Sequence, residues 1–471
     1  MSRPVIFKTI KTYAHKYVYD RHTNSIVRLT EDEYNELTQV EKGELAGEQS
    51  QVIKKYQESG LFVPNVVEKI EHPATAIIEQ YMDTRMKQLT LQVTQQCNLR
   101  CEYCSYSGIY SGNRTHSSKR MSFETAKDAI DFFLKRSSAL TEGTIGFYGG
   151  EPLLEFELIK QCVEYAKSCV EGKKITFNMT TNGTLLTDAV VDYLADNDFS
   201  LAISVDGSKE EHDVNRKFVN GAGSFDTIMD NIKRIRSRRP EFDKNIFFMT
   251  TVNPYMDLGC VLEYFSTDEI FSDRQIMFNT MNELGLGQEL PYDEKYFRVR
   301  NYEYIKMLLA LVGKLDMKYV SPLAASSRDK KKQNLRHLRS HSELAPTVHH
   351  NGPCMPGLQR LFVRTDGALF PCERVNHELD YFKIGMLEGG LDMGKMKAIL
   401  NIGQVTETEC KTCWNLKHCS ICAGQIEFET EPTKSCKLVQ CAQNEANAFS
   451  ELNELCILSE FGIDVEMEVL T

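Results

Sequence analysis

The sequence has few of the features that mark nucleic-acid-binding, secreted or membrane proteins. Acidic residues outnumber basic ones by 66 to 55 among 471 residues, which gives a formal net charge of −11. A general nucleic-acid binder carries a basic face instead. No run of about 18 apolar residues is present, so no membrane span is expected. The first twenty residues mix polar and apolar side chains and lack the pattern of a signal peptide. We therefore expect a cytoplasmic protein without nucleic-acid or membrane partners.

Cysteine, in contrast, is abundant. The chain contains 15 cysteines. Without a secretion signal we expect reduced thiols rather than disulfides, and clustered thiols in such a chain indicate metal or redox chemistry. The length of 471 residues suggests two to four domains. Four cysteines fall in predicted helices away from the clusters and are expected to be buried as small hydrophobic residues: Cys162, Cys169, Cys260 and Cys456.

Residues 1–85 are expected to form a small unit. Segment 16–29 alternates polar and apolar residues on both sides of Thr23-Asn24-Ser25, which predicts a β-hairpin. Thr30 and Glu33 have the spacing of a helix capping box, and a second helix is predicted to stop at Gly60. The pattern is typical of a winged-helix-like module. DNA binding is the alternative for such a module, and the acidic stretch 30–37 disfavours it.

Residues 86–315 alternate between predicted strands and predicted helices, which indicates the α/β class with a parallel sheet. The expected helices include 122–136, 224–238 and 294–315. Six such units are too few for a closed eight-stranded barrel, so the pattern predicts an open, partial (β/α)6 barrel. The six expected strands are 88–94, 144–149, 175–181, 201–205, 246–252 and 275–280.

Residues 316–350 are expected to bridge this barrel to a cysteine-rich domain over 351–471. The bridge contains a basic stretch at 327–343, interpreted as an exposed linker or helix in preference to a binding patch. A further helix is predicted at 442–461.

The first candidate site directly follows the first barrel strand, where barrel active sites lie. Cys97, Cys101 and Cys104 form a Cys-x3-Cys-x2-Cys pattern, and no fourth cysteine follows before Cys162. Zinc sites and cubane clusters usually take four protein ligands. Three thiolates can hold three irons of a [4Fe–4S] cluster and leave one iron open to a small molecule with an amino and a carboxylate group. A structural zinc site, with His116 as the fourth ligand, is the alternative.

The second candidate site ends the second predicted strand. Gly149 and Gly150 let the backbone approach a ligand closely. Glu151 can accept a hydrogen bond from an ammonium group, and Pro152 follows it.

These two motifs, in this order and at these strand ends, resemble those of the radical S-adenosylmethionine (SAM) enzymes, whose fold is a partial (β/α)6 barrel. The resemblance implies that SAM binds the open iron and that Gly149, Gly150, Glu151 and Pro152 cradle it. Tyr103 matches the aromatic residue near adenine. Loops 180–183 and 204–207 match the family's third and fourth strand loops, so Ser204 is an implied contact to the carboxylate or ribose, and Arg216 is a further candidate for the carboxylate. No catalytic base is identified.

The C-terminal cysteines resemble a SPASM domain, which holds auxiliary [4Fe–4S] clusters in radical SAM peptide maturases. Gly367 lies five residues before Cys372, as in that family, but two residues rather than three separate Cys419 from Cys422. The resemblance implies one cluster on Cys354, Cys372 and Cys422, and a second on Cys410, Cys413, Cys419 and either Cys436 or Cys441. Either Cys441 completes the first set, or one iron stays open for a substrate thiolate. Zinc ribbons are the alternative.

Over nearly the full chain, the arrangement resembles the thioether-forming maturases of cysteine-rich peptides, the sactipeptide and ranthipeptide group. This implies an oxidoreductase-type enzyme that forms a 5′-deoxyadenosyl radical and joins cysteine sulfur to carbon in a ribosomally made precursor peptide. The N-terminal module would bind the leader segment, and flavodoxin or ferredoxin would supply low-potential electrons. Alternatives are carbon–carbon cross-linking, formylglycine formation in sulfatases, or a non-catalytic electron carrier or zinc scaffold. The bonded carbon and the number of cross-links stay open.

Overall fold

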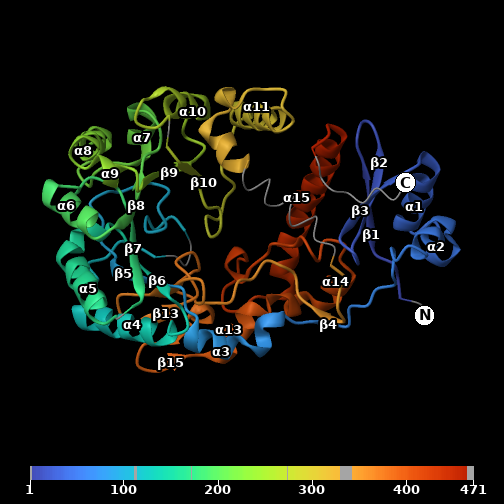
Figure 1. Ribbon diagram of the computed structural model, residues 1–471, viewed down its shortest axis with the longest axis horizontal. Helices are drawn as coiled ribbons and strands as arrows, with labels where there is room; N and C mark the ends of the chain where they lie inside the picture. The colour runs from blue at the N-terminus through green and yellow to red at the C-terminus, as the bar shows by residue number, and fades with distance from the viewer. Residues whose placement is uncertain (1–2, 111–113, 171, 273, 329–341, 464–471) are drawn as a thin grey trace.

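The computed structural model describes residues 3–110, 114–170, 172–272, 274–328 and 342–463. Its centre is a parallel sheet in which all six predicted strands lie in chain order. In the described part of the chain β10 pairs only with β9, so the barrel is open on that side, as predicted (Figure 1). The strands are β5 (Gln88–Thr94), β6 (Glu142–Gly149), β7 (Lys174–Thr181), β8 (Phe199–Ser204), β9 (Ile246–Val252) and β10 (Ile276–Thr280).

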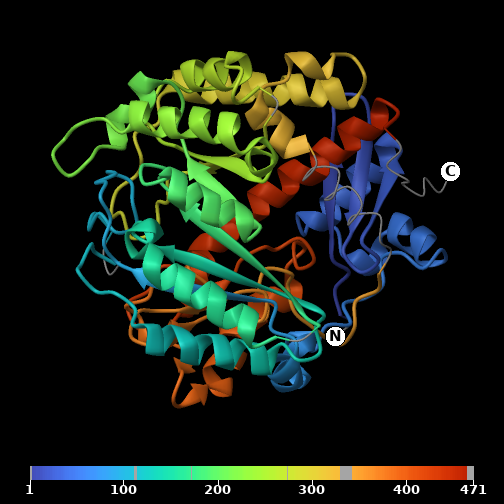
Figure 2. The same cartoon turned by 60° about the vertical axis from the view of Figure 1, so that its left-hand side comes forward.

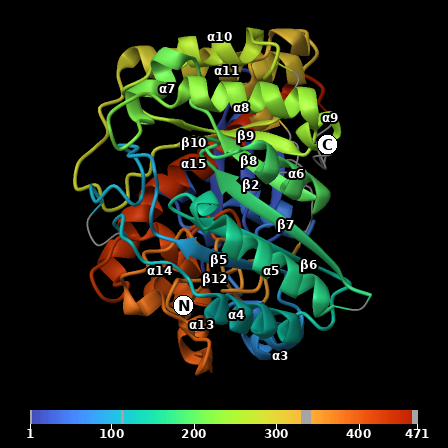
Figure 3. The ribbon, with the colours of Figure 1, turned by 90° about the vertical axis from the view of Figure 1, so that its left-hand side faces the viewer.

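Helices cover the outer face of this sheet (Figure 3). Their apolar sides and the strands share one core that includes Phe133, Phe147 and Phe177. The predicted helices at 122–136 and 224–238 are confirmed as α4 and α8. The helices are α4 (Phe123–Arg136), α5 (Phe156–Ser168), α6 (Asp188–Asp196), α7 (Lys209–Asn215), α8 (Phe225–Arg238), α9 (Pro240–Asp243), α10 (Leu258–Thr267) and α11 (Glu294–Leu311).

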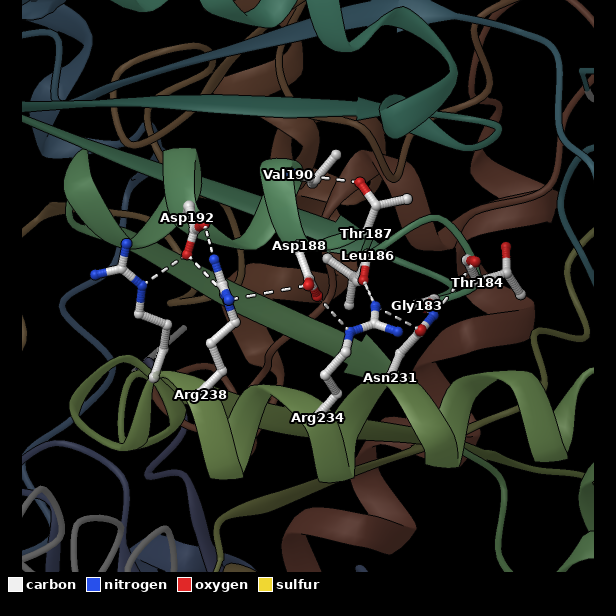
Figure 4. A network of polar contacts seen from close by, with 11 residues as sticks. Gly183, Thr184, Leu186, Thr187, Asp188, Val190, Asp192, Asn231, Arg234 and Arg238 are labelled. Carbon is white, nitrogen blue, oxygen red and sulfur yellow. Dashed lines mark hydrogen bonds and ion pairs between the residues drawn. The ribbon is translucent and has the colours of Figure 1, made fainter.

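Ion pairs join α6 to α8 on the outside of the barrel (Figure 4). Asp188 pairs with Arg234 at 2.8 Å, and Asp192 pairs with Arg238. All four side chains are at least about one quarter exposed, so solvent screens these pairs and they contribute little to stability.

The barrel sheet continues past β5 into the cysteine-rich part of the chain. β12 (Leu361–Val363) pairs in parallel with β5, and its Leu361 lies opposite Leu89. Three antiparallel strands follow: β13 (Ala368–Phe370), β14 (Gly385–Met386) and β15 (Gly390–Leu391). The predicted boundary at residue 351 therefore falls between two parts of the chain that share one sheet.

The N-terminal residues form a separate three-stranded antiparallel sheet of β1 (Phe7–Lys11), β2 (Lys16–Asp20) and β3 (Ser25–Leu29). The predicted hairpin is confirmed as β2 and β3, and the capping box of Thr30 and Glu33 opens α1 (Glu31–Glu41). α2 (Gln51–Gln57) follows. α3 (Ile78–Thr84) belongs to the barrel instead, because its buried Ile78 and Met82 join the barrel core.

One long helix links the cysteine-rich region to this N-terminal sheet. α15 (Lys434–Glu460) ends against it, where Leu452 and Leu455 pack with Tyr17 and Tyr19 (Figure 2). The strands β4 (Lys69–Ile70) and β11 (Thr347–Val348) pair in parallel and so join two segments that are far apart in the sequence. The remaining elements are α13 (Met393–Leu400), α14 (Glu407–Thr412) and 3₁₀ turns at Gly47–Gln49, Pro73–Ala76, Pro152–Glu155, Met317–Tyr319, Asp380–Phe382, Ile402–Thr406 and Ala423–Gln425.

The isolated cysteines behave differently from one another. Cys162 and Cys456 are buried as predicted, but Cys169 and Cys260 are exposed, so the prediction is wrong for them. Cys169 caps the end of α5, and Cys260 lies on the outer side of α10, whose neighbouring Val261 occupies the core side.

Most of the basic stretch 327–343 lies outside the described residues. Within the described ranges, no helix combines the length and the apolar character that a membrane crossing requires.

Candidate functional site

The three cysteines of the first motif lie on the loop after β5, at the carboxyl edge of the sheet. Backbone N–H groups donate to two of the sulfurs, from Leu99 to Cys97 Sγ at 3.4 Å and from Tyr106 to Cys104 Sγ at 3.4 Å. The Asn182 amide also donates to Cys97 Sγ, at 3.8 Å. Donors aimed at sulfur favour the charged thiolate, which is the form that binds metal.

Without metal these thiols hold their protons. Burial raises the pKa of Cys97 to about 11, and the Glu151 carboxylate adds to the rise. Burial also raises the pKa of Cys101 to about 12, although the Arg216 cation opposes the rise. A cationic metal centre would displace these protons and compensate the thiolates. The donor set and its charge therefore fit a cluster held by three cysteines.

The Gly149–Gly150 pair passes directly against this cysteine loop. A Cβ on Gly149, whose φ is +148°, would lie 2.1 Å from the Thr94 carbonyl oxygen, and one on Gly150 would lie 2.2 Å from the Gln96 carbonyl oxygen. The N–H of Gly150 donates to Thr94 at 3.1 Å. Only glycine fits such a close approach, so the second motif sets the position of the first.

Glu151 is almost fully enclosed, with 1% of its surface exposed. Its carboxylate accepts hydrogen bonds from the Thr181 hydroxyl at 2.7 Å, from Asn182 N–H at 2.8 Å and from Leu153 N–H at 3.1 Å. Burial raises its pKa to about 7, although these donors oppose the rise. The side chain thus joins the loop after β6 to the loop after β7, and Pro152 opens the 3₁₀ turn that follows.

Tyr103, Asp206 and Arg216 form a buried polar group beside the cysteines. Arg216 Nε donates to Asp206 Oδ2 at 2.7 Å, the Tyr103 hydroxyl donates to the same oxygen, and the guanidinium lies 5.4 Å from the centre of the Tyr103 ring. Burial alone would raise the pKa of Asp206, but the charges of Arg216 and His212 and the hydrogen bonds from Arg216 and Tyr103 together lower it. Ser204, the last residue of β8, is 9% exposed and lies two residues before Asp206.

A cavity of 820 Å³ opens beside this group. Its walls come from the loops after β5, β9 and β10, and they include Cys101, Tyr103, Tyr106, Tyr255, Met281 and Leu286. The volume lies in the range of cavities that hold cofactors and small ligands. The cysteine loop therefore faces a space large enough for SAM.

The C-terminal cysteines gather into two sets. In the first, burial raises the pKa of Cys372 to about 11, with Glu373 and then Cys354 adding to the rise. Burial also raises the pKa of Cys354, and Cys422 adds to that rise. Cys354 therefore interacts electrostatically with both Cys372 and Cys422, and the shared cluster stays a prediction.

In the second set, burial raises the pKa of Cys419 to about 11, and Cys410 and Cys441 add to the rise. The pKa of Cys413 is raised to about 12, first by burial and then by neighbours that include Cys410 and Cys419. Cys436 instead takes part in local bonds at the start of α15, where Thr433 donates to its sulfur at 3.0 Å from N–H. Electrostatic effects therefore link Cys441 to the second set, and the choice between Cys436 and Cys441 as the ligand stays a prediction.

In the described ranges, no three His, Cys, Asp or Glu side chains converge closely enough to hold a single ion. Each thiolate of a cubane binds a different iron, so cubane ligands stand farther apart than zinc ligands. The auxiliary clusters stay a prediction at these cysteines.

Sequence reasoning missed several polar residues that order these loops. Asn182 and Asp206 lie in the two loops that it selected, but nothing in the sequence indicated which polar side chain would be buried. Arg114, which donates to the Glu373 carbonyl at 3.1 Å and lies 4.8 Å from the Tyr106 ring centre, carries no motif at all.

Comparison with known proteins gives the following similarities. Residues 91–258 match the Radical SAM superfamily. An uncharacterized protein of Methanocaldococcus jannaschii is 30% identical over 246 residues, which cover 52% of this chain and 77% of that protein. A cysteine-type anaerobic sulfatase-maturating enzyme of Clostridium novyi is 27% identical over 320 residues, which cover 64% and 78% of the two chains.

The radical SAM cyclopropyl synthase TigE of Paramaledivibacter caminithermalis is 23% identical over 429 residues, which cover 85% of this chain and 81% of that protein. The solved structure of native anSMEcpe with bound AdoMet superposes with a TM-score of 0.56 at 19% identity, over 79% of this chain and 99% of that chain, and so shares the fold. These matches show that the chain belongs to the radical SAM superfamily, whose enzymes use SAM and a [4Fe–4S] cluster, and that it is related to the sulfatase maturases.

Proposed function

We propose that this enzyme installs thioether cross-links between cysteine sulfur and carbon in a ribosomally made, cysteine-rich precursor peptide. The observation that supports this proposal is that Cys441 acts electrostatically on Cys419 together with Cys410, whereas the Cys436 sulfur accepts a hydrogen bond from Thr433 N–H at 3.0 Å. The first set then has Cys354, Cys372 and Cys422, and a cubane there keeps one iron for a substrate thiolate. A cysteine of the peptide held at that iron would lie ready for bond formation, because proximity selects the reacting partner.

The SAM site in this proposal is built from the first two motifs. Cys97, Cys101 and Cys104 hold the cluster, and the segment 149–152 cradles the methionyl group. When bound, the cluster and SAM supply a 5′-deoxyadenosyl radical that removes a hydrogen atom from the peptide. The protein's part is to orient these groups and to exclude side reactions.

Arg216 and Tyr103 have distinct roles toward SAM. Within the described residues, the hydrogen bonds of the Arg216 side chain are made through Nε, to Asp206, which leaves both Nη groups for a carboxylate. A guanidinium is suited to that partner because its N–H groups match the geometry of a carboxylate. Tyr103 is fixed by its hydroxyl bond to Asp206, so its ring can pack against adenine, and Ser204 is placed to contact the ribose or carboxylate.

The two auxiliary clusters complete the assignment. The first takes Cys354, Cys372 and Cys422, and the second takes Cys410, Cys413, Cys419 and Cys441. Arg114 lies between the two kinds of cluster site, because it donates to the Glu373 carbonyl beside Cys372 and its charge lowers the pKa of Cys104 against the rise that burial causes.

The N-terminal sheet supports a peptide substrate. We assign residues 1–85 as a winged-helix-like leader-recognition element that adds the leader as a strand at the sheet edge. Residues 86–315 form the barrel, 316–350 the bridge and 351–471 the SPASM domain. Flavodoxin or ferredoxin in the cytoplasm would be the electron donor.

Mass spectrometry of a cysteine-rich precursor peptide co-expressed with the enzyme tests the proposal. We expect the loss of two hydrogen atoms per cross-link and cysteines that resist alkylation. Free thiols after turnover would contradict thioether formation. Cys104→Ala should abolish both SAM cleavage and cross-linking, whereas Cys372→Ala should retain SAM cleavage and lose cross-linking. A Cys372→Ala enzyme that cross-links at the normal rate would contradict the role of the first auxiliary set.

Formylglycine formation in a sulfatase is the second candidate, because four relatives of this chain are named as sulfatase-maturating enzymes. A peptide that carries a sulfatase active-site cysteine distinguishes the two. Conversion of that cysteine to an aldehyde, detected with a hydrazide reagent, would favour the second candidate over the first.

A further inference from the structure

Lys437 is a buried lysine in the first turns of α15, with 1% of its surface exposed. Its ammonium donates to the Thr406 hydroxyl at 2.5 Å and to Cys410 Sγ at 3.6 Å. Its charge also reaches two further cysteines of the second auxiliary set, because it opposes the rise that burial causes in the pKa values of Cys419 and Cys441. Lys437 therefore contacts one thiol of this set and acts electrostatically on two more.

Among the residues described, no carboxylate lies within ion-pair distance of Lys437. Glu409 lies farther off and pairs with Lys434, and the nearby His349 and His350 are depressed in pKa to about 4 and about 2, chiefly by burial, and stay neutral. Burying an ammonium without an anion is very costly. The anion that the site lacks is the one that thiolates around a cluster would supply.

A second buried cation, Arg21, reaches the fourth cysteine of this set, Cys413, from the N-terminal part of the chain. Arg21, 2% exposed, donates to the carbonyls of Lys411 at 2.9 Å and Cys413 at 3.1 Å. Arg21 Nη2 also donates a hydrogen bond to Asn65 Oδ1 at 2.5 Å, which fixes the guanidinium. The guanidinium lies near the Cys413 thiol, whose charge opposes the fall that burial causes in the pKa of Arg21. Lys437, in α15, and Arg21, directly after β2, thus approach the second set from different elements of the chain.

We propose that Lys437, with Arg21 opposite it, is a positioning residue that raises the reduction potential of the cluster bound by Cys410, Cys413, Cys419 and Cys441. A cluster becomes one charge more negative when one electron reduces it, so buried cations stabilise the reduced state. The inference rests on the proposed auxiliary cluster and adds a function for it: this cluster is tuned to accept an electron.

Two carboxylates oppose the two cations, and one of them is Glu409, whose charge raises the pKa of Cys441. Glu445 lies 3.8 Å from Cys413 Sγ and also raises the pKa of Cys441 after burial. It is only half-buried, so solvent screens its charge more than it screens Lys437 or Arg21.

The test is a redox titration of the anaerobically reconstituted full-length enzyme, followed by electron paramagnetic resonance. The signal of interest is the one that Cys441→Ser alters. We expect Lys437→Met to lower the equilibrium constant for its one-electron reduction at least tenfold, which is a shift of about −59 mV. Lys437→Arg, which keeps the charge, should change that constant less than about twofold.

Lys434→Met is the matched control, because it removes the same charge from the same turn of α15 but from a side chain that is 57% exposed. It should leave the potential unchanged. Arg21→Gln should shift the same signal in the same direction as Lys437→Met. An unchanged potential in Lys437→Met with wild-type iron content would overturn the proposal, as would loss of iron in every Lys437 variant, which would mean a purely structural role.

The experiments distinguish a failure of the Lys437 proposal from a failure of the thioether proposal. Three cubanes hold about twelve irons. A wild-type enzyme with clearly fewer irons would lack the auxiliary clusters, which would overturn both the thioether proposal and the Lys437 proposal. A wild-type enzyme with full iron content that makes another product would overturn the thioether proposal and leave the potential shift standing.

Discussion

Asp206→Asn is the most informative single substitution at the SAM site. Asp206 is fully enclosed, and its Oδ2 accepts from Arg216 Nε at 2.7 Å and from the Tyr103 hydroxyl, while Oδ1 accepts from Thr251 N–H at 2.9 Å. An asparagine can keep the bond to Thr251 with its oxygen. Its NH2 group would then face two donors, and the buried Arg216 cation would lose its counter-charge.

The size of the effect follows from this geometry. Removing one partner of a buried ion pair costs about 3–5 kcal/mol, because the other charge stays buried without compensation. The folded-state pKa of Asp206 is lowered, so its stabilisation is complete above the ordinary aspartate pKa of about 4 and is lost as the pH falls through the lower folded value. The deficit of the variant should therefore be largest at neutral pH and shrink in acid.

The assay is urea unfolding of the anaerobic protein at pH 7, followed by circular dichroism, together with SAM binding. Asp192→Asn is the control, because it removes the same charge from the exposed pairs with Arg238 and Arg239 on the barrel exterior (Figure 4), and it should unfold like the wild type. Combining Asp206→Asn with Arg216→Gln should recover part of the stability. A loss below about 1 kcal/mol for Asp206→Asn, or no recovery in the double variant, would refute the reasoning.

Three further predictions concern other parts of the molecule. Gly150→Ala should abolish SAM binding and lower cluster content, since the added Cβ would meet the Gln96 carbonyl at 2.2 Å, whereas Gly389→Ala, which meets nothing within 4 Å, should bind normally; iron analysis and SAM titration check this. In cluster-free protein, Glu151→Gln should remove a fall in unfolding free energy between pH 4.5 and about 7, because the raised pKa of about 7 makes the protonated form the stable one; a fall that persists in the variant would contradict this. Deleting residues 1–66 should lower iron content by about four atoms per chain, because it removes Arg21 and Asn65 from the Cys410–Cys413 loop; full iron content would exclude that dependence.

The sequence was enough to predict the barrel strands and the motif loops. Each strand is an apolar run that ends in a polar or glycine-rich loop, and such local patterns survive folding. Burial inside the loops was not predictable: Ser204 was selected in its motif, yet Asp206 makes the buried ion pair. The bond of Lys437 to Cys410 crosses 27 residues, and that of Arg21 to the Cys413 carbonyl crosses 392. No local pattern carries such information.

The parallel pairing of β12 with β5 affects how the chain is made. Leu361 enters the sheet opposite Leu89, so a ribosome must add about 270 residues before the edge of β5 finds its partner. During that interval β5 exposes unpaired backbone groups, which can pair with another chain. Contacts this distant in sequence form slowly. We therefore expect truncated or stalled chains that end before residue 361 to aggregate, and expression yield to depend on chaperones that shield this strand.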